Sequence, residues 1–177
     1  MSDVSVRVRV PFADVDSSQR IHYTAMFRYM EVAEHALMRS IGFPYATTLR
    51  ELAFPRVRLS CDFKGAIFYD DLLDITARVE HVGVSSWTVA FLALPASPES
   101  AGEDAVRGVS APVEARERSR DWLAEGHMTI VAMDPTTERA TPVPAGLRRA
   151  LLGETGARQK PDDEADDWDF MPPSAAE

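Results

Sequence analysis

Apolar and polar residues alternate along the first segment of the chain. The alternation places Val4, Val6, Val8 and Val10 on one face and Ser5, Arg7 and Arg9 on the other. A period of two residues is typical of a half-buried β-strand. Pro11 ends this segment, and a polar turn that contains Asp14 and Asp16 follows it.

A helical period replaces the alternation from about residue 23 to residue 41. Apolar residues recur there with the spacing i, i+4, i+7, namely Met26, Met30, Ala33, Leu37 and Ile41. Further apolar residues widen both flanks of this stripe, which favours a helix that other structure wraps. Thr24 is the expected N-cap, and Gly42 is well placed to end the helix.

Strand-like alternation returns after the helix. It covers residues 56–63, 73–80, 86–94 and about 122–133, with a hairpin connection at 81–85 and a short helix near 145–152. Residues 95–119 are predicted to be a loop insertion, of which 106–115 could form an extra edge strand. This order of elements predicts an α+β fold, with an antiparallel sheet of about five strands against one long central helix. One helix cannot cover such a sheet, so we expect an edge or a face to pair with a second subunit.

Composition and charge limit the class of protein. The 177 residues suffice for one domain, and the single cysteine, Cys61, rules out an internal disulfide. Of the net charge of −9, residues 154–177 carry −6, which leaves a nearly neutral body and no sign of a nucleic-acid surface. We therefore expect a domain at 1–153 and a disordered acidic tail at 154–177. No segment resembles a signal peptide or a membrane span, so a cytoplasmic protein without membrane contact is expected.

One stretch of the chain carries a known pattern. Phe12, Asp14-Val15-Asp16, a polar turn and His22-Tyr23 precede a helix that contains Tyr29-Met30-Glu31-Val32-Ala33. This order resembles the signature of the 4-hydroxybenzoyl-CoA-thioesterase-like family of hotdog proteins. The resemblance extends to residues 71–75 and 124–126 and covers about residues 5 to 150. It implies a hotdog fold and hydrolysis of an acyl thioester.

The resemblance also implies catalytic roles. Asp16 matches the carboxylate that attacks the thioester carbonyl or activates the water that does, and the backbone N–H of Tyr23 matches the oxyanion donor. The chemistry is sound, since a thioester is electrophilic enough for a carboxylate and a helix N-terminus offers unpaired N–H groups. Asp14 is expected to be structural. The alternative is that both aspartates only form a turn.

Other polar residues have weaker signals. His22 and Thr24 could orient the substrate, and Arg56 and Arg58 could contact coenzyme A phosphates, as could Arg116, Arg118 and Arg120. Glu31 and Glu34 are expected to form salt bridges or subunit contacts, although a helix-borne catalytic carboxylate is the alternative. Relatives often have Gly where Gln19 stands and Asn where Ala25 stands. The histidines lack ligand spacing, so neither a metal nor another cofactor is expected.

The sequence as a whole predicts a thioesterase that acts as a homodimer or homotetramer on acyl-CoA or on an acyl-carrier-protein thioester. A hotdog module that binds such a thioester without hydrolysing it remains an alternative. A hotdog dehydratase or hydratase is another, but its His-Phe-Pro-Gly-like segment is not visible, because Tyr23-Thr24 follows His22.

Overall fold

The computed structural model of the chain describes residues 3–96 and 122–154. Most of the predicted loop insertion therefore lies outside the described residues, as do Arg116, Arg118 and Arg120. The same holds for the predicted acidic tail from residue 155 onward.

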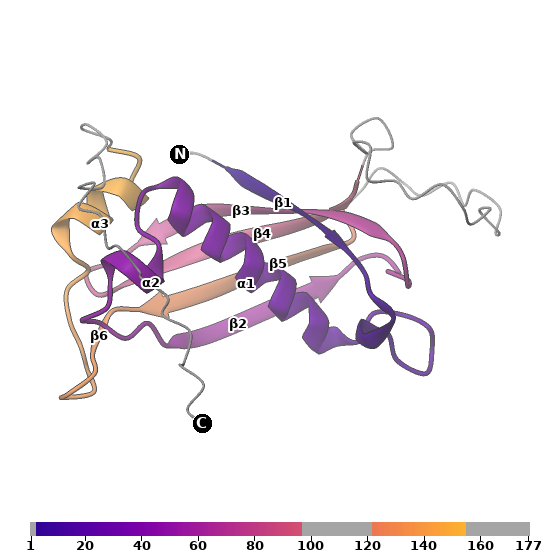
Figure 1. Cartoon of the computed structure of the whole chain (residues 1–177), viewed down its shortest axis with the longest axis horizontal. Helices are drawn as coiled ribbons and strands as arrows, with labels where there is room; N and C mark the ends of the chain where they lie inside the picture. The colour runs from indigo at the N-terminus through magenta and orange to yellow at the C-terminus, as the bar shows by residue number, and fades with distance from the viewer. Residues whose placement is uncertain (1–2, 97–121, 155–177) are drawn as a thin grey trace, which may run out of the picture.

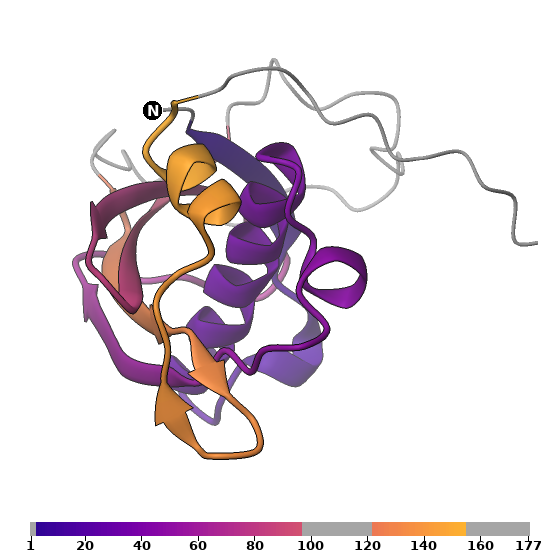
Figure 2. The same cartoon turned by 90° about the vertical axis from the view of Figure 1, so that its left-hand side faces the viewer.

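Five strands form one antiparallel sheet. They are β1 (Val4–Arg9), β2 (Arg56–Phe63), β3 (Leu72–Val82), β4 (Ser86–Pro95) and β5 (Ala124–Val131), in the spatial order β1-β3-β4-β5-β2. The long helix α1 (Tyr23–Ser40) crosses one face of this sheet, which curls around it (Figures 1 and 2). The predicted α+β architecture, one long helix against a five-stranded sheet, is confirmed.

Shorter elements gather at one end of α1. The helices α2 (Tyr45–Thr48) and α3 (Ala145–Leu151) lie near its C-terminal end, away from the 3-10 turn Phe12–Asp14 (Figure 1). A small hairpin pairs β6 (Met133–Asp134) with β7 (Arg139–Ala140). The α3 helix was predicted, whereas α2, β6 and β7 are too short to produce a period in the sequence.

The first residue of α1 is Tyr23, and its N-cap is His22. The Nδ1 atom of the His22 ring lies 3.4 Å from the backbone nitrogen of Thr24, from which it accepts a hydrogen bond, and 2.7 Å from Oγ1 of Thr24. The prediction that Thr24 is the N-cap is therefore wrong, because the histidine ring takes that role two residues earlier. At the other end Gly42 follows with φ +84°, a left-handed conformation that suits glycine and ends the helix.

The core lies between α1 and the inner face of the sheet. The predicted stripe is buried from Met26 to Leu37, and Ile41, the C-cap, is partly buried. The same core contains Ile75, Trp87, Val89, Phe91, Met128 and Ile130 from the three central strands. Burial of each such side chain contributes about 1.5–3 kcal/mol relative to exposure. Although α1 is long, no helix in the described residues is both long and apolar enough to cross a membrane.

The edge strand β2 contains a register irregularity between Arg56 and Arg58. Because of it, Arg56 pairs with Ile130 and shares the inner face with Leu59. The strict alternation predicted for this strand, with Arg56 opposite the apolar residues, is wrong at this point. Leu59 and Phe63 remain 43% and 41% exposed, so β2 presents an apolar strip along one edge of the sheet.

Candidate functional site

The polar turn before α1 is a tight hairpin. Val15 bridges Ile21, and the backbone N–H of Asp16 donates to the carbonyl of Arg20 at 2.9 Å. Gln19 adopts φ +62°, a left-handed conformation that glycine adopts at lower cost. The turn thus keeps the shape that a glycine would permit, and it holds the segment 16–20 beside the start of α1.

Asp16 is exposed on this turn. Its Oδ1 atom accepts hydrogen bonds from the backbone N–H of Ser18 at 2.8 Å and from the Ser18 hydroxyl at 2.6 Å. These bonds favour the charged form and hold the pKa of Asp16 below its ordinary value of 3.8. The backbone N–H of Arg20 and the nearby ring of His22 act in the same direction. The side chain is thus an exposed, ionised carboxylate that its own turn orients.

Asp14 has a different environment, although it stands only two residues earlier. It is 9% exposed, and its carboxylate accepts from the Tyr29 hydroxyl at 2.6 Å and forms an ion pair with Arg28. Its backbone carbonyl accepts from the N–H of His22 at 2.7 Å. Burial and the bond to Asp14 raise the pKa of Tyr29, so the phenol remains a donor. Asp14 therefore ties the turn to α1, in keeping with the structural role expected for it.

The start of α1 leaves one backbone N–H without an acceptor. The N–H of Ala25 donates to the carbonyl of His22 at 2.9 Å, and the N–H of Thr24 points to the His22 ring. Among the described residues no acceptor is found for the N–H of Tyr23. The helix dipole places partial positive charge at this end, so this N–H is suited to an anionic oxygen.

An open hollow of about 310 Å³ lies at this end of the helix. It is lined by Arg20, Ile21, Tyr23, Phe63, Lys64, Gly65, Ala66 and Ile67. Its volume lies at the lower end of the range for small-molecule sites. Lys64 makes only an exposed ion pair with Glu125 at 3.4 Å, so a ligand anion could compete for it. Sequence reasoning missed Arg20 and Lys64; the pair Lys64-Gly65 directly after an apolar strand was the available signal.

Arg56 lies elsewhere, toward the C-terminal half of α1. Its Nη2 atom is 2.6 Å from Oε2 of Glu34, a carboxylate with 0% exposure that the Tyr45 hydroxyl also contacts. The expectation that Glu34 forms a salt bridge is thus met. Arg58 is exposed on β2, and neither arginine lines the hollow. A role for Arg56 or Arg58 in binding coenzyme A stays a prediction.

Comparison with known proteins gives a consistent picture. A family model described as "Thioesterase superfamily" matches residues 19–94, which run from the turn through α1 to β4. A candidate esterase of Aquifex aeolicus (strain VF5) is 32% identical over 88 residues, which are 49% of this chain and 68% of that protein.

Solved structures share the fold at low sequence identity. A 1,4-dihydroxy-2-naphthoyl-CoA thioesterase from Synechocystis has a TM-score of 0.67 and 14% identity, over 85% of this chain and 96% of that one. A 4-hydroxybenzoyl CoA thioesterase mutant in complex with 4-hydroxybenzoyl CoA has a TM-score of 0.67 and 17% identity, over 84% and 98%. A hypothetical protein from Aquifex aeolicus has a TM-score of 0.66 and 19% identity, over 84% and 98%. The predicted hotdog fold is confirmed.

Proposed function

The chain belongs to the thioesterase superfamily, and from that premise we propose that it hydrolyses an acyl thioester, with acyl-coenzyme A as the substrate. One observation carries the proposal. An ionised and exposed carboxylate, Asp16, stands on a hydrogen-bonded turn beside the helix end, where the described residues offer no acceptor for the N–H of Tyr23. Tyr23 lines an open hollow of ligand size, and the turn that carries Asp16 reaches the hollow through Arg20 and Ile21.

Asp16 can act in either of two ways. As a nucleophile, its carboxylate oxygen attacks the carbonyl carbon, the thiolate leaves, and water then hydrolyses the mixed anhydride to release the acid and restore the carboxylate. As a general base, Asp16 removes a proton from water while the resulting hydroxide attacks, and that proton then goes to the leaving thiolate. In both routes negative charge develops on the carbonyl oxygen, where the Tyr23 N–H stabilises it.

The charges around the hollow suit a phosphorylated thiol carrier. Arg20 and Lys64 lie on its lining, and Arg58 remains a further candidate contact if coenzyme A extends along β2. His22 and Thr24, which bond to each other, fix the helix start on which Tyr23 is carried. The neighbours named as CoA thioesterases support coenzyme A over a carrier protein.

Self-association belongs to the same proposal. The inner-face residues Leu59 and Phe63 of β2 are partly exposed in the single chain, and β2 is an edge strand. Exposed apolar strands favour pairing with another copy. We expect a homodimer or homotetramer, in which the hollow beside Phe63 lies close to the subunit boundary.

The test is release of free thiol from a panel of short-chain, long-chain and aromatic acyl-CoA substrates. Asp16→Asn removes the charge and preserves the size, so kcat is expected to fall on the order of a hundredfold or more, with little change in KM. Glu31→Gln, an exposed substitution on α1, serves as the matched control and as a test of a helix-borne carboxylate. Full turnover in Asp16→Asn would exclude this mechanism. Binding of acyl-CoA by the wild type without thiol release would instead identify a non-catalytic module.

A further inference from the structure

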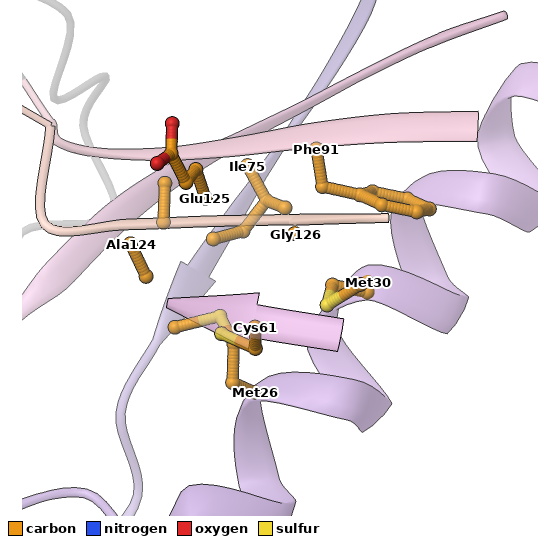
Figure 3. Close-up of a pocket in the computed structure, with 9 residues that line it drawn as sticks. Met26, Met30, Cys61, Ile75, Phe91, Ala124, Glu125 and Gly126 are labelled. Atoms are coloured by element: carbon orange, nitrogen blue, oxygen red, sulfur yellow. The ribbon is translucent and has the colours of Figure 1, made fainter. Parts of the chain in front are cut away.

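A second, much narrower cavity lies between α1 and the sheet. Its free volume is about 10 Å³, room for little more than one water molecule. It is lined by Met26, Met30, Cys61, Ile75, Phe91, Ala93, Ala124, Glu125 and Gly126. In Figure 3 the side chains of Met26, Met30 and Cys61 reach into this space, whereas the carboxylate of Glu125 points away from it.

The cavity and the open hollow are lined by successive positions of the same two elements. On α1, Tyr23 lines the hollow and Met26, three residues later, lines the cavity, a rise of about 4.5 Å along the helix. On β2, Phe63 lines the hollow and Cys61 lines the cavity, two residues apart on one face of the strand. A path from the helix N-terminus into the interior would therefore run between these two elements, from the hollow to the cavity.

Met30 closes the inner end of this path. A Cβ atom built at Gly126 would lie 3.0 Å from Cε and 3.2 Å from Sδ of Met30, so the methionine side chain occupies the space that this glycine leaves. Met30 is only 1% exposed. An unbranched thioether with several rotatable bonds adapts to its surroundings more readily than a branched side chain. The same Cβ position lies 2.5 Å from the backbone oxygen of Ser60, so the space at Gly126 is bounded by fixed backbone on one side and by the movable side chain of Met30 on the other.

The lining also restricts which acyl groups this cavity could bind. Apart from Glu125, whose carboxylate points away, it consists of hydrocarbon and sulfur. Burial raises the pKa of the Cys61 thiol to about 11, so it is uncharged at neutral pH. A hydroxyl or carboxylate on the acyl group would lose its water there without gaining a strong partner, which disfavours such groups.

We propose that the acyl group of the substrate enters this path, that it is an unsubstituted aliphatic chain, and that Met30 sets how long it can be. The inference rests on the proposed function, because it assigns the acyl end of a thioester whose carbonyl lies at Asp16 and Tyr23. Displacement of Met30 from its place against Gly126 makes room for the chain. Met30 is thus a specificity-determining residue.

Hydrolysis of a series from acetyl-CoA to palmitoyl-CoA tests the length limit. Met30→Ala is expected to move the optimum of kcat/KM to longer chains, and to raise kcat/KM for a chain two carbons longer by roughly fifteenfold, since each of the two buried methylenes contributes about fourfold. Met30→Leu, which nearly conserves volume but moves less readily, is not expected to shift the optimum to longer chains. Met38→Ala removes an equally buried methionine of α1 that does not line the cavity, and it controls for a loosened core. An unchanged chain-length profile in a folded Met30→Ala protein would overturn the proposal.

A second experiment needs only the wild type. Cys61 is the single cysteine of the chain, so its reaction with a small thiol reagent reports on the cavity. S-alkyl coenzyme A thioethers, which cannot be hydrolysed, are expected to slow the labelling several-fold, whereas coenzyme A alone and an ω-hydroxyalkyl thioether are not. Equal labelling rates with every thioether, alongside normal hydrolysis, would overturn the inference and leave the proposed function standing. Protection of Cys61 without any hydrolysis would support the acyl site and reject the proposed function.

Discussion

The hydroxyl of Tyr29 donates a 2.6 Å hydrogen bond to Oδ2 of Asp14. This bond gives Asp14 surroundings that differ from those of Asp16 in the same turn. Asp14 is enclosed by side chains of α1, whereas Asp16 faces solvent and is held only within its own turn. We therefore expect the two carboxylates to have different roles: Asp14 fixes the turn, and Asp16 carries the reactive charge.

Asp14→Asn is expected to lower stability more than it lowers chemistry. The amide keeps the size but weakens the ion pair with Arg28 and presents a second donor to Tyr29. Loss of satisfied buried hydrogen bonding costs about 1–3 kcal/mol. Thermal melts should show a lower Tm for Asp14→Asn and for Tyr29→Phe, with residual turnover in the folded fraction. A normal Tm together with turnover as low as that of Asp16→Asn would contradict this division of roles.

The activity is expected to persist to low pH. The hydrogen bonds from Ser18 hold the pKa of Asp16 below 3.8, so the carboxylate stays ionised until the pH falls below about that value. The pKa of Asp16 is lower in the folded state than in the unfolded state. Any stabilisation of the fold by these bonds is therefore fully present above the unfolded-state pKa, and it is lost as the pH falls through the folded-state pKa. The fall of kcat/KM on the acid side of the pH profile should occur below pH 4, and Ser18→Ala should shift this fall to higher pH. An acid limb near neutrality would point to another titrating group.

Glu34 is expected to be important for stability. It has no exposed surface and is neutralised by Arg56 and bonded by Tyr45, so removal of its charge leaves the guanidinium half-buried without its partner. Breaking a buried ion pair in this way costs about 3–5 kcal/mol. Urea unfolding should show this loss for Glu34→Gln and almost none for the exposed Glu31→Gln. Addition of Arg56→Met to Glu34→Gln should restore part of the stability, and equal midpoints for all variants would refute the account.

Self-association should be sensitive to substitutions on the edge strand β2. A charge at Leu59 would have to be buried on pairing, which costs more than 1.4 kcal/mol and so weakens association on the order of tenfold or more. Sedimentation equilibrium of Leu59→Lys should show this shift toward monomer. Ser5→Lys, on the opposite edge strand β1, should not. A wild type that is monomeric at micromolar concentration would remove the second subunit from the proposal.

Much of the fold could be predicted because the apolar patterns of its main elements extend over many residues. The stripe from Met26 to Leu37 and the alternation in β1, β3 and β4 extend over enough residues to identify a helix and strands. Arg56 could not be placed, since one irregularity in β2 reverses the facing that alternation predicts. Gln19 shows the same limit, because the left-handed conformation there is imposed by the surrounding hairpin and not by its own preference.

The candidate site was predictable only in part. Asp16 and Tyr23 are close in sequence, so a motif of the turn and helix start contains both. Phe63 and Lys64 are distant from Asp16 and Tyr23 in the sequence. They line the hollow because of the position that β2 takes in the sheet, which local spacing does not predict. On a helical wheel Glu34 falls on the apolar face of α1, between Met30 and Met38, where a carboxylate needs partners. Those partners come from α2 and β2, which the sequence pattern does not bring together.

The sheet order has a consequence for how the chain folds. The two strands synthesised first, β1 and β2, end at opposite edges, while the hairpin of β3 and β4 occupies the middle. Arg7 and Asp74, whose side chains bridge β1 to β3, are 67 residues apart in the chain, so docking of the first strand must await β3, about halfway along the domain. Such distant pairing slows folding, and we expect the central hairpin and α1 to form the nucleus. Core truncations such as Val89→Ala should then slow refolding, whereas truncations in β1 such as Val6→Ala should mainly accelerate unfolding.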